Sequence, residues 1–348
     1  MTEEAKPAET KPAAPAVKVP FGVGLDIGTM NIVAARRAAD GIKTKRMRDV
    51  FIDLSATSKK MLKLSATSFV DREDDVLILG DAALETANVF GSQPRRPLSN
   101  GIISPSETDS LEVLGMLIKN VLGEPRTPNE ACYFSVPADP IDRPGVDIIY
   151  HKGVFERIVT ECGYTAYAAN EAMGIVYSET ANEGFSGIGI SFGSGMTNVA
   201  LSINTIEGLT FSVARGGDWI DAGAAGSVGQ TQARICALKK KGFDLTKPLG
   251  REQEALAFYY KSAIDYALDK IEEQFKSIQS QFSLAKPIPI VVSGGTSKAG
   301  GFMDFFTEVF EKRRKKFPLE ISELRHVKEP LNAVAYGLLI QAIQEHED

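Results

Sequence analysis

The chain has 348 residues, of which 43% are hydrophobic and 24% are charged, a composition sufficient for two globular domains of ordinary size. A net charge of −6 excludes a general nucleic-acid-binding protein, which would carry a strongly basic face. No stretch approaches the roughly 20 apolar residues of a membrane-spanning helix, and the three cysteines form no CxxC pair, so we expect a cytoplasmic protein with reduced thiols.

Residues 1–20 consist almost entirely of Thr, Glu, Ala, Lys and Pro. Such a segment cannot bury enough apolar surface to offset its ordering entropy, so we expect a disordered tail. It has neither the apolar centre of a signal peptide nor the apolar stripe of an interfacial helix. Direct membrane insertion is therefore not expected.

The first half of the ordered chain begins with a hairpin, in which residues 21–28 predict a strand ending in glycine and residues 31–36 predict its antiparallel return. The more polar stretch at about 50–95 predicts a small inserted subdomain. Helical spacing of apolar residues predicts a helix from Asp109 and another over 153–162. Between these helices, residues 132–136 predict a buried strand.

The second half repeats this beginning. Residues 187–192 and 197–203 predict two strands around a glycine-rich turn, about 165 residues after the first hairpin. A long helix follows, with one apolar face made by Leu256, Tyr260, Ile264, Leu268, Ile271 and Phe275. A strand at 289–292 and helices near 302–309 and 331–342 complete a pattern that predicts an α/β fold with a weak internal duplication.

The first glycine turn has the residue types of a phosphate-binding loop. Gly28 allows backbone N–H groups to converge on an anion, and Thr29, Met30 and Asn31 complete the turn. Thr29 and Asn31 can add side-chain donors. Asp26, at the strand end, is expected to hold Mg²⁺ through water, because Mg²⁺ keeps several waters and binds few carboxylates.

Three more small, polar segments are candidate contacts to the same ligand: Gly193, Ser194, Gly195, Met196 and Thr197; Gly217 and Asp218; and Gly294, Gly295 and Thr296. The first of them would grip a polyphosphate from the side opposite the first turn. The glycines of the last would let an adenine ring lie against the backbone. Each segment, taken alone, is also typical of an ordinary loop.

The order of these segments resembles that of the prokaryotic actins, with MreB and the magnetosome filament protein MamK as the nearest. The resemblance covers residues 21–344 and rests on Asp-Ile-Gly-Thr-x-Asn (26–31), Val-Pro-Ala (136–138), Asn-Glu-Ala-Met (170–173), the second glycine turn, Gly-Gly-Asp (216–218) and Ser-Gly-Gly-Thr (293–296). It places the chain in the superfamily of actins, heat-shock chaperone ATPases and sugar kinases.

The resemblance implies an actin-like (ribonuclease H-like) α/β fold of duplicated domains, with ATP and Mg²⁺ in the cleft between them. Domain I would comprise residues 21–184 plus the C-terminal helix 331–346, with the inserted subdomain at about 50–95. Domain II would comprise residues 185–330, with an insertion at about 223–286. Glu171 falls at the family position that orients the attacking water. From residue type alone, a surface carboxylate at a helix N-terminus is an equal alternative.

Two positions depart from the family pattern. Ser191 stands where prokaryotic actins carry Asp, and Met196 stands where they carry Thr. Loss of a charge near the metal should weaken catalysis more than binding, so we expect a weak ATPase. Ser191 is expected to face the γ-phosphate, and Ser191→Asp to raise turnover. The ribose-binding helix also lacks its acidic residue, which leaves Arg234 and Lys239 as alternatives.

The function implied by the resemblance is a filament whose subunits join head to tail on binding ATP. Its partners would be further copies of the chain and cytoplasmic adaptor proteins. Three alternatives stay open: a chaperone-type ATPase, a sugar or acetate kinase, and a nucleotide-binding regulatory protein that does not polymerise. The basic run 312–316 is expected to be a solvated helix end.

Overall fold

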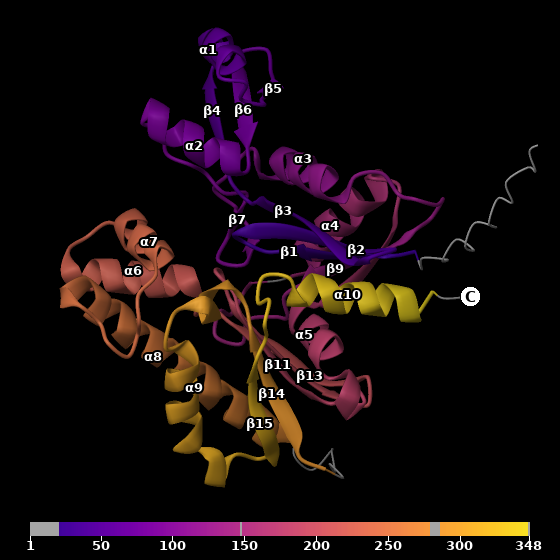
Figure 1. Ribbon diagram of the computed structural model, residues 1–348, viewed down its shortest axis with the longest axis vertical. Coiled ribbons are helices and arrows are strands. Elements are labelled where there is room, and N and C mark those ends of the chain that lie inside the picture. Colours follow the sequence, from indigo (N-terminus) through magenta and orange to yellow (C-terminus); the bar gives the residue numbers. More distant parts are fainter. Residues whose placement is uncertain (1–20, 147, 279–285, 347–348) are drawn as a thin grey trace, which may run out of the picture.

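The computed structural model describes residues 21–146, 148–278 and 286–346, so the expected N-terminal tail lies outside the described residues. Two five-stranded sheets organise these residues (Figure 1). The N-terminal sheet has the order β10-β9-β1-β2-β3, and the C-terminal sheet has the order β15-β14-β11-β12-β13. In both sheets the first three strands of this order are parallel, and the last two join antiparallel. The predicted internal duplication is therefore confirmed in the strand topology.

The strands of the N-terminal sheet are β1 Val23–Ile27, β2 Asn31–Ala38, β3 Gly41–Arg48, β9 Ala131–Val136 and β10 Thr165–Asn170. Those of the C-terminal sheet are β11 Gly187–Phe192, β12 Thr197–Ile203, β13 Ile206–Val213, β14 Ile288–Ser293 and β15 Ile321–His326. The central strands β9, β11 and β14 are buried along their whole length. Both predicted hairpins, β1–β2 and β11–β12, are confirmed at their predicted turns.

Of the ten strands in the two five-stranded sheets, the four that the sequence did not predict are the edge strands β3, β10, β13 and β15. Edge strands are half exposed and carry polar residues, as in the mostly exposed sequence of β3. In β3, neither the alternation of a one-sided strand nor the apolar run of a buried strand is present, whereas β13 alternates at Leu209, Phe211 and Val213 and could have been predicted.

Helices cover both sheets, and two of them pack between the sheets. The helices beside the N-terminal sheet are α3 Ser110–Leu122 and α4 Ile149–Glu161, and those between the two sheets are α5 Glu171–Glu179 and α10 Ala333–Gln344. α10 packs against α5, β1 and β9 (Figure 1). The backbones of α5 and α10 touch where Gly174 meets Gly337, because a Cβ on Gly337 would lie 1.7 Å from the Gly174 carbonyl oxygen. Glycine at this crossing lets the two sheets approach each other closely.

A separate small unit projects from the N-terminal sheet at the top of Figure 1. Its parts are β4 Phe51–Ser55, β5 Val70–Asp71, β6 Asp75–Leu79, η1 Ala56–Ser58, α1 Lys59–Leu64 and α2 Asp81–Phe90. It has its own hydrophobic core, which includes Ile52, Leu62 and Ile78. The short hairpin of β7 Leu98–Ser99 and β8 Ile102–Ile103 follows it.

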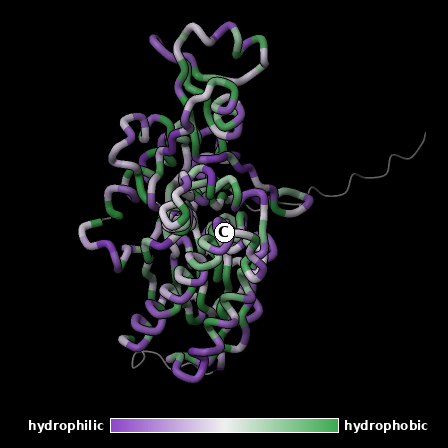
Figure 2. The backbone as a smooth tube through the Cα atoms, turned by 90° about the vertical axis from the view of Figure 1, so that its left-hand side faces the viewer, coloured by the Kyte–Doolittle hydropathy of each residue, from purple (hydrophilic) through white to green (hydrophobic). Residues whose placement is uncertain are grey.

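The helices of the C-terminal half are α6 Gly217–Val228, α7 Gln232–Lys241, α8 Gly250–Ile278 and α9 Phe302–Glu311, with short turns at η2 Ala181–Glu183, η4 Gly295–Lys298 and η5 Arg314–Lys316. The apolar face predicted for α8, from Leu256 to Phe275, is buried in the core of this half. Figure 2 shows hydrophobic residues along the inner parts of the tube and hydrophilic residues along the outer turns. In the basic run, Arg313 donates to Asp265, Asp269 and Glu272 of α8, so this run is held by ion pairs.

Candidate functional site

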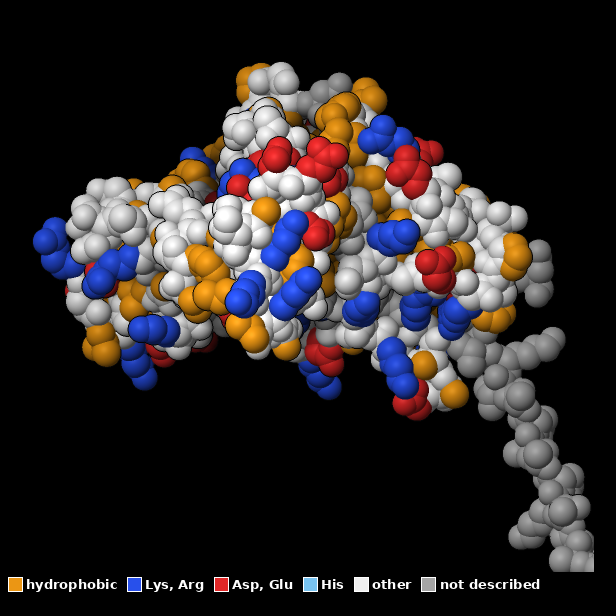
Figure 3. Space-filling view, turned by 90° about the horizontal axis from the view of Figure 1, so that it is seen from above, with side chains coloured by type: hydrophobic (Ala, Val, Ile, Leu, Met, Phe, Trp, Pro, Cys, Tyr) orange, Lys and Arg blue, Asp and Glu red, His pale blue; other side chains and the backbone are white. Residues whose placement is uncertain are grey.

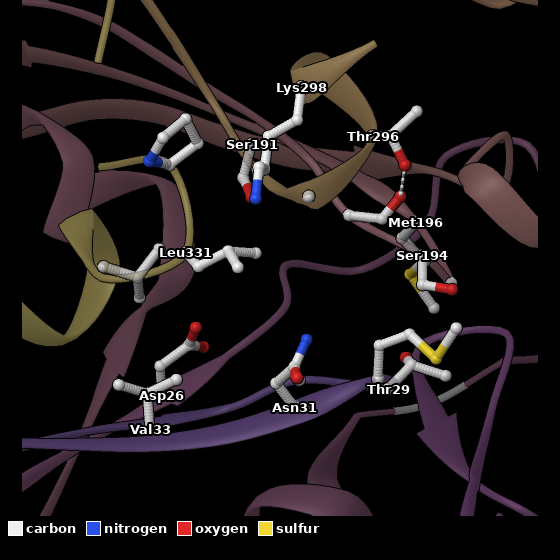
Figure 4. A pocket seen from close by; sticks show the side chains of 18 of the residues that line it. Asp26, Thr29, Asn31, Val33, Ser191, Ser194, Met196, Thr296, Lys298 and Leu331 are labelled. Atoms are coloured by element: carbon white, nitrogen blue, oxygen red, sulfur yellow. Dashed lines mark hydrogen bonds between the residues drawn. The ribbon is translucent and has the colours of Figure 1, made fainter. Parts of the chain in front are cut away.

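A cavity of about 530 Å³ lies between the two sheets. The two hairpin turns, the start of α5, the end of α7 and the segment after β14 line it. Figure 4 shows Asp26, Thr29 and Asn31 on one side of the cavity and Ser191, Thr296 and Lys298 on the opposite side. The duplicated topology explains this arrangement, because it brings the equivalent turn of each sheet to the same space.

The two turns have the same backbone geometry. The Gly28 N–H donates to the Asn31 carbonyl over 3.0 Å, and the Gly193 N–H donates to the Met196 carbonyl over 3.0 Å. Each turn therefore has two central residues, and these central residues line the cavity. Turns of this kind form anion-binding concavities.

The cavity wall includes most of the residues predicted as ligand contacts: Asp26, Gly28, Thr29, Met30, Asn31, Glu171, Gly193, Ser194, Gly195, Met196, Gly294, Gly295 and Thr296. Three predicted contacts, Thr197, Gly217 and Asp218, do not line it. Thr197 is fully buried, and its hydroxyl donates to the Arg215 carbonyl over 2.9 Å. Its side chain lies on the far side of the strand because successive side chains of a strand alternate between faces.

Gly217 and Asp218 stabilise the second turn through backbone hydrogen bonds. The Gly217 N–H donates to the Gly193 carbonyl over 3.0 Å, and the Asp218 N–H donates to the Ser194 carbonyl over 2.8 Å. The hydroxyl of Thr296 also donates to the Gly193 carbonyl, over 2.8 Å. These bonds use the carbonyl groups of Gly193 and Ser194 and thereby hold the second turn in place.

Two acidic side chains share the cavity. Asp26 accepts a hydrogen bond of 2.9 Å from Ser135, whose hydroxyl in turn accepts the Ile27 N–H over 2.8 Å. Glu171 is the first residue of α5, and Asn170 caps that helix by accepting the Ala172 N–H over 2.9 Å. Ser135 was not predicted as a site residue, because only the pairing of β9 with β1 brings it to Asp26.

Burial raises the pKa of both acids. The pKa of Asp26 is raised by burial and lowered in part by the Ser135 hydrogen bond. The pKa of Glu171 is raised by burial and by the charge of Asp26, and is lowered in part by the Ser191 hydrogen bond. Two neighbouring carboxyl groups with raised pKa values form a site where a cation would be stabilised.

These donors fit a hydrated Mg²⁺ ion bound together with phosphates. Among the described residues there is no group of three or more His, Cys, Asp or Glu side chains that could hold a metal ion by themselves. Mg²⁺ characteristically takes one or two carboxylates and completes its shell with water and phosphate oxygens. Asp26 is the carboxylate that fits this role.

Ser191 lines the cavity and contacts its second acid. Its hydroxyl donates to Glu171 Oε1 over 2.6 Å, so the group expected to meet metal-bound water is bonded to the second acid of the cavity. An aspartate at this position would place a second carboxylate beside Glu171, and the effect of Ser191→Asp on turnover stays a prediction. The contact could not be seen in the sequence because residues 171 and 191 meet only through tertiary packing.

Arg234 and Lys239, the two alternatives for a ribose contact, lie in different places relative to the cavity. Lys239 lines the cavity and donates to Asp221 over 2.8 Å. Arg234 is exposed, does not line the cavity and donates to Glu252 over 2.9 Å. Lys240 and Lys298 also line the cavity, whose wall therefore includes several positive side chains.

All of these site residues lie within the range 21–342, and this whole range matches the sequence profile of the Volactin family. The chain belongs to the Volactin family. Comparison with curated proteins finds no match. The structure of this Volactin-family chain is similar to solved structures of actin-like proteins, and this similarity tests the predicted fold.

Three of these structures illustrate the similarity. The MamK double helical filament has a TM-score of 0.66 at 19% identity and covers 94% of this chain and 99% of its own. MreB 5 of Spiroplasma citri bound to AMPPNP has a TM-score of 0.65 at 16% identity, covering 95% and 98%. The ethanolamine utilization protein EutJ from Carboxydothermus hydrogenoformans has a TM-score of 0.55 at 16% identity, covering 95% and 91%.

These similarities confirm the predicted fold. The Volactin-family chain has the mixed α/β, two-domain fold of actin-like proteins, and the predicted resemblance to MreB and MamK is correct. At these identities the similarity establishes the fold alone. None of the helices in the described part of this chain has the length and apolar character required to cross a membrane.

Proposed function

We propose that this chain binds ATP with Mg²⁺ in the cavity between its two sheets and, with ATP bound, assembles head to tail into filaments. The observation that carries the proposal is the pair of equivalent turns, each closed by a 3.0 Å glycine N–H bond, on opposite sides of one cavity. Two facing anion-binding turns suit a polyphosphate better than a single phosphate group.

In this proposal the residues have distinct roles. The backbone of the turns at Gly28 and Gly193 binds the phosphates, and the side chains of Thr29 and Asn31 add donors. Asp26 holds Mg²⁺ through water, and the ion shields the negative charge of the phosphates when bound. Gly294 and Gly295 provide the surface for the adenine, and Lys239 lies at the ribose end. Thr197, Gly217 and Asp218 support the second turn.

Several of the similar structures contain a bound nucleotide or form a filament, which supports nucleotide binding and self-association for this chain. One is a non-polymerising MamK mutant bound to AMPPNP, and another is MreB5 of Spiroplasma citri bound to ADP. Two are MamK filaments. A filament needs a heterologous interface that does not close on itself.

Surface chemistry supports an interface at the small projecting unit. On α1 the side chains of Met61 and Leu64 are 47% and 81% exposed. Figure 3, which views the molecule from above, shows hydrophobic side chains among Lys and Arg on this face. We propose that this end of one subunit meets the opposite end of the next. The proposed domain division is the one expected from the sequence, with insertions at about 50–95 and 223–286.

Hydrolysis in this proposal is slow, with Glu171 orienting the attacking water. The setting is cytoplasmic, with adaptor proteins as further partners and without direct membrane insertion. The regulatory alternative is a protein that binds ATP in the same cavity without polymerising or turning it over.

The test is to measure nucleotide binding and assembly separately. Equilibrium binding of a fluorescent ATP analogue, with and without Mg²⁺, tests the site. Light scattering and negative-stain electron microscopy with ATP, ADP and no nucleotide test the filament. We expect binding that needs Mg²⁺ and polymer with ATP. Binding without polymer at any salt concentration would favour the regulatory alternative, and no binding would refute the proposal.

A further inference from the structure

A row of three polar side chains crosses the C-terminal sheet beneath Glu171. Ser191 of β11 lies opposite Asn198 of β12, and Asn198 lies opposite Ser212 of β13. All three residues are buried, at 1%, 2% and 0% exposure. Buried polar groups need hydrogen-bond partners, so the partners of these three side chains show which group of the protein they position.

The row ends on the carboxylate of Glu171. Ser191 donates to Oε1 over 2.6 Å, and the Asn198 amide donates to Oε2 over 2.8 Å. The Ser212 hydroxyl donates to Asn198 Oδ1. That bond fixes the amide orientation, since Oδ1 must face Ser212 and the NH₂ group must face Glu171.

We propose that Ser191 and Asn198 are positioning residues that fix the carboxylate of Glu171 by one hydrogen bond to each oxygen. The proposal rests on the proposed function, in which Glu171 orients the attacking water. A carboxylate has about four lone-pair sites, so an oxygen that accepts one of these bonds can still accept a water. The Asn170 cap holds the backbone of Glu171, and the two donors hold its side chain.

The two donors also favour the ionised form of Glu171, because hydrogen bonds to a carboxylate stabilise its charge. They act against burial and against the charge of Asp26 on β1, both of which raise the pKa of Glu171. In this chain, serine at position 191 therefore supplies a donor to the water-orienting acid rather than a second negative charge.

The first test is a double-mutant cycle. Ser191→Ala and Asn198→Ala are each expected to lower kcat for ATP hydrolysis about tenfold, the effect of about 1.4 kcal/mol, with KM within about twofold. In a Glu171→Gln background the same changes should have no further effect, because they act through Glu171. Ser191→Thr keeps the hydroxyl and should restore most of the activity. The control is Ser202→Ala, which removes another buried hydroxyl of the same sheet, one bonded to the Phe185 carbonyl.

The second test does not need turnover. A carbon-13 NMR titration of glutamate side-chain carboxyls, with Glu171 assigned as the signal missing from Glu171→Gln, reports its protonation directly. We expect Ser191→Ala and Asn198→Ala to move the Glu171 midpoint upward by about one pH unit, and Ser202→Ala to leave it unchanged. An unchanged midpoint in both variants would overturn the proposal. Failure of the wild-type chain to bind ATP would refute the proposed function. The titration would then still show whether Ser191 and Asn198 position Glu171.

Discussion

Arg96 and Asp218 form an ion pair of 3.0 Å that joins the segment before β7 to the start of α6. Asp218 also accepts the Ser194 hydroxyl over 3.0 Å, so the pair is connected to the second glycine turn. Burial raises the pKa of Asp49 well above its usual value, and the positive charge of Arg96 opposes this rise. One guanidinium therefore connects the N-terminal half of the chain to the turn that we propose binds phosphate.

We expect this ion pair to stabilise the closed arrangement of the two halves. A double-mutant cycle of Arg96→Ala and Asp218→Ala, measured by thermal or denaturant unfolding, should give a coupling free energy of about 0.5–3 kcal/mol. The exposed pair Lys261 and Glu308 is the control and should give a smaller coupling free energy, because solvent screens exposed ion pairs. Equal coupling in the two cycles would show that the Arg96 pair has no special role.

Glu171→Gln keeps the shape of the side chain and removes its charge. We expect ATP affinity to change by less than about tenfold, or about 1.4 kcal/mol. Phosphate release should slow by about a hundredfold or more, the usual effect of losing a positioned acid–base group. Binding of a fluorescent ATP analogue and a phosphate-release assay measure the two quantities. A large loss of affinity with normal hydrolysis would mean that Glu171 is structural.

The raised pKa values of Asp26 and Glu171 predict how stability depends on pH in the absence of nucleotide. An acid whose pKa is higher in the folded state stabilises the fold below its unfolded pKa, and this contribution is lost as pH rises through the folded pKa. The unliganded chain should therefore lose stability from about pH 4 towards neutral pH and above, by an amount of the order of 1 kcal/mol or more.

Asp26→Asn should flatten this dependence because it removes one acid and the repulsion on Glu171. Melting temperatures of the wild-type and Asp26→Asn chains at matched ionic strength give the comparison. Parallel curves for the two chains would contradict the electrostatic account of the cavity.

Gly195 lies against the N-terminal half of the chain. A Cβ at this position would approach the Gly101 nitrogen to 2.0 Å, a backbone contact that cannot give way easily. We expect Gly195→Ala to prevent close approach of the second turn and to lower ATP affinity by at least tenfold, or about 1.4 kcal/mol. Gly226→Ala in α6 is the matched control, because nothing lies within 4 Å of its added Cβ. That variant should bind ATP normally and gain up to about 1 kcal/mol of stability.

Removal of residues 1–20 should leave both folding and assembly unchanged, because the segment has almost no apolar side chains to bury. The deletion should keep Phe21 and Gly22, since Arg126 stacks over the Phe21 ring and the Gly22 N–H donates to Glu130. Melting temperature and light scattering of the shortened chain are the measurements. A lower melting temperature would show that the segment contributes to the fold.

The sequence by itself determined the two hairpins, the buried central strands and the long amphipathic α8, because each has a local signal in glycine position or apolar spacing. It also placed most residues of the cavity wall, since glycine turns such as those at Gly28 and Gly193 require special residues. The hairpin register even contains the pairing of Ser191 with Asn198, which follows from a two-residue turn at Ser194 and Gly195.

Only the tertiary structure decided the rest. The edge strand β3 has no local signal, because strand pairing rather than burial holds it in place. The contacts of Glu171 with Ser191, of Asp26 with Ser135 and of Arg96 with Asp218 join residues about 20, 109 and 122 positions apart. Such polar contacts form only where the packing of sheets and helices brings two side chains together. A local pattern of residues carries no information about which distant residues will meet.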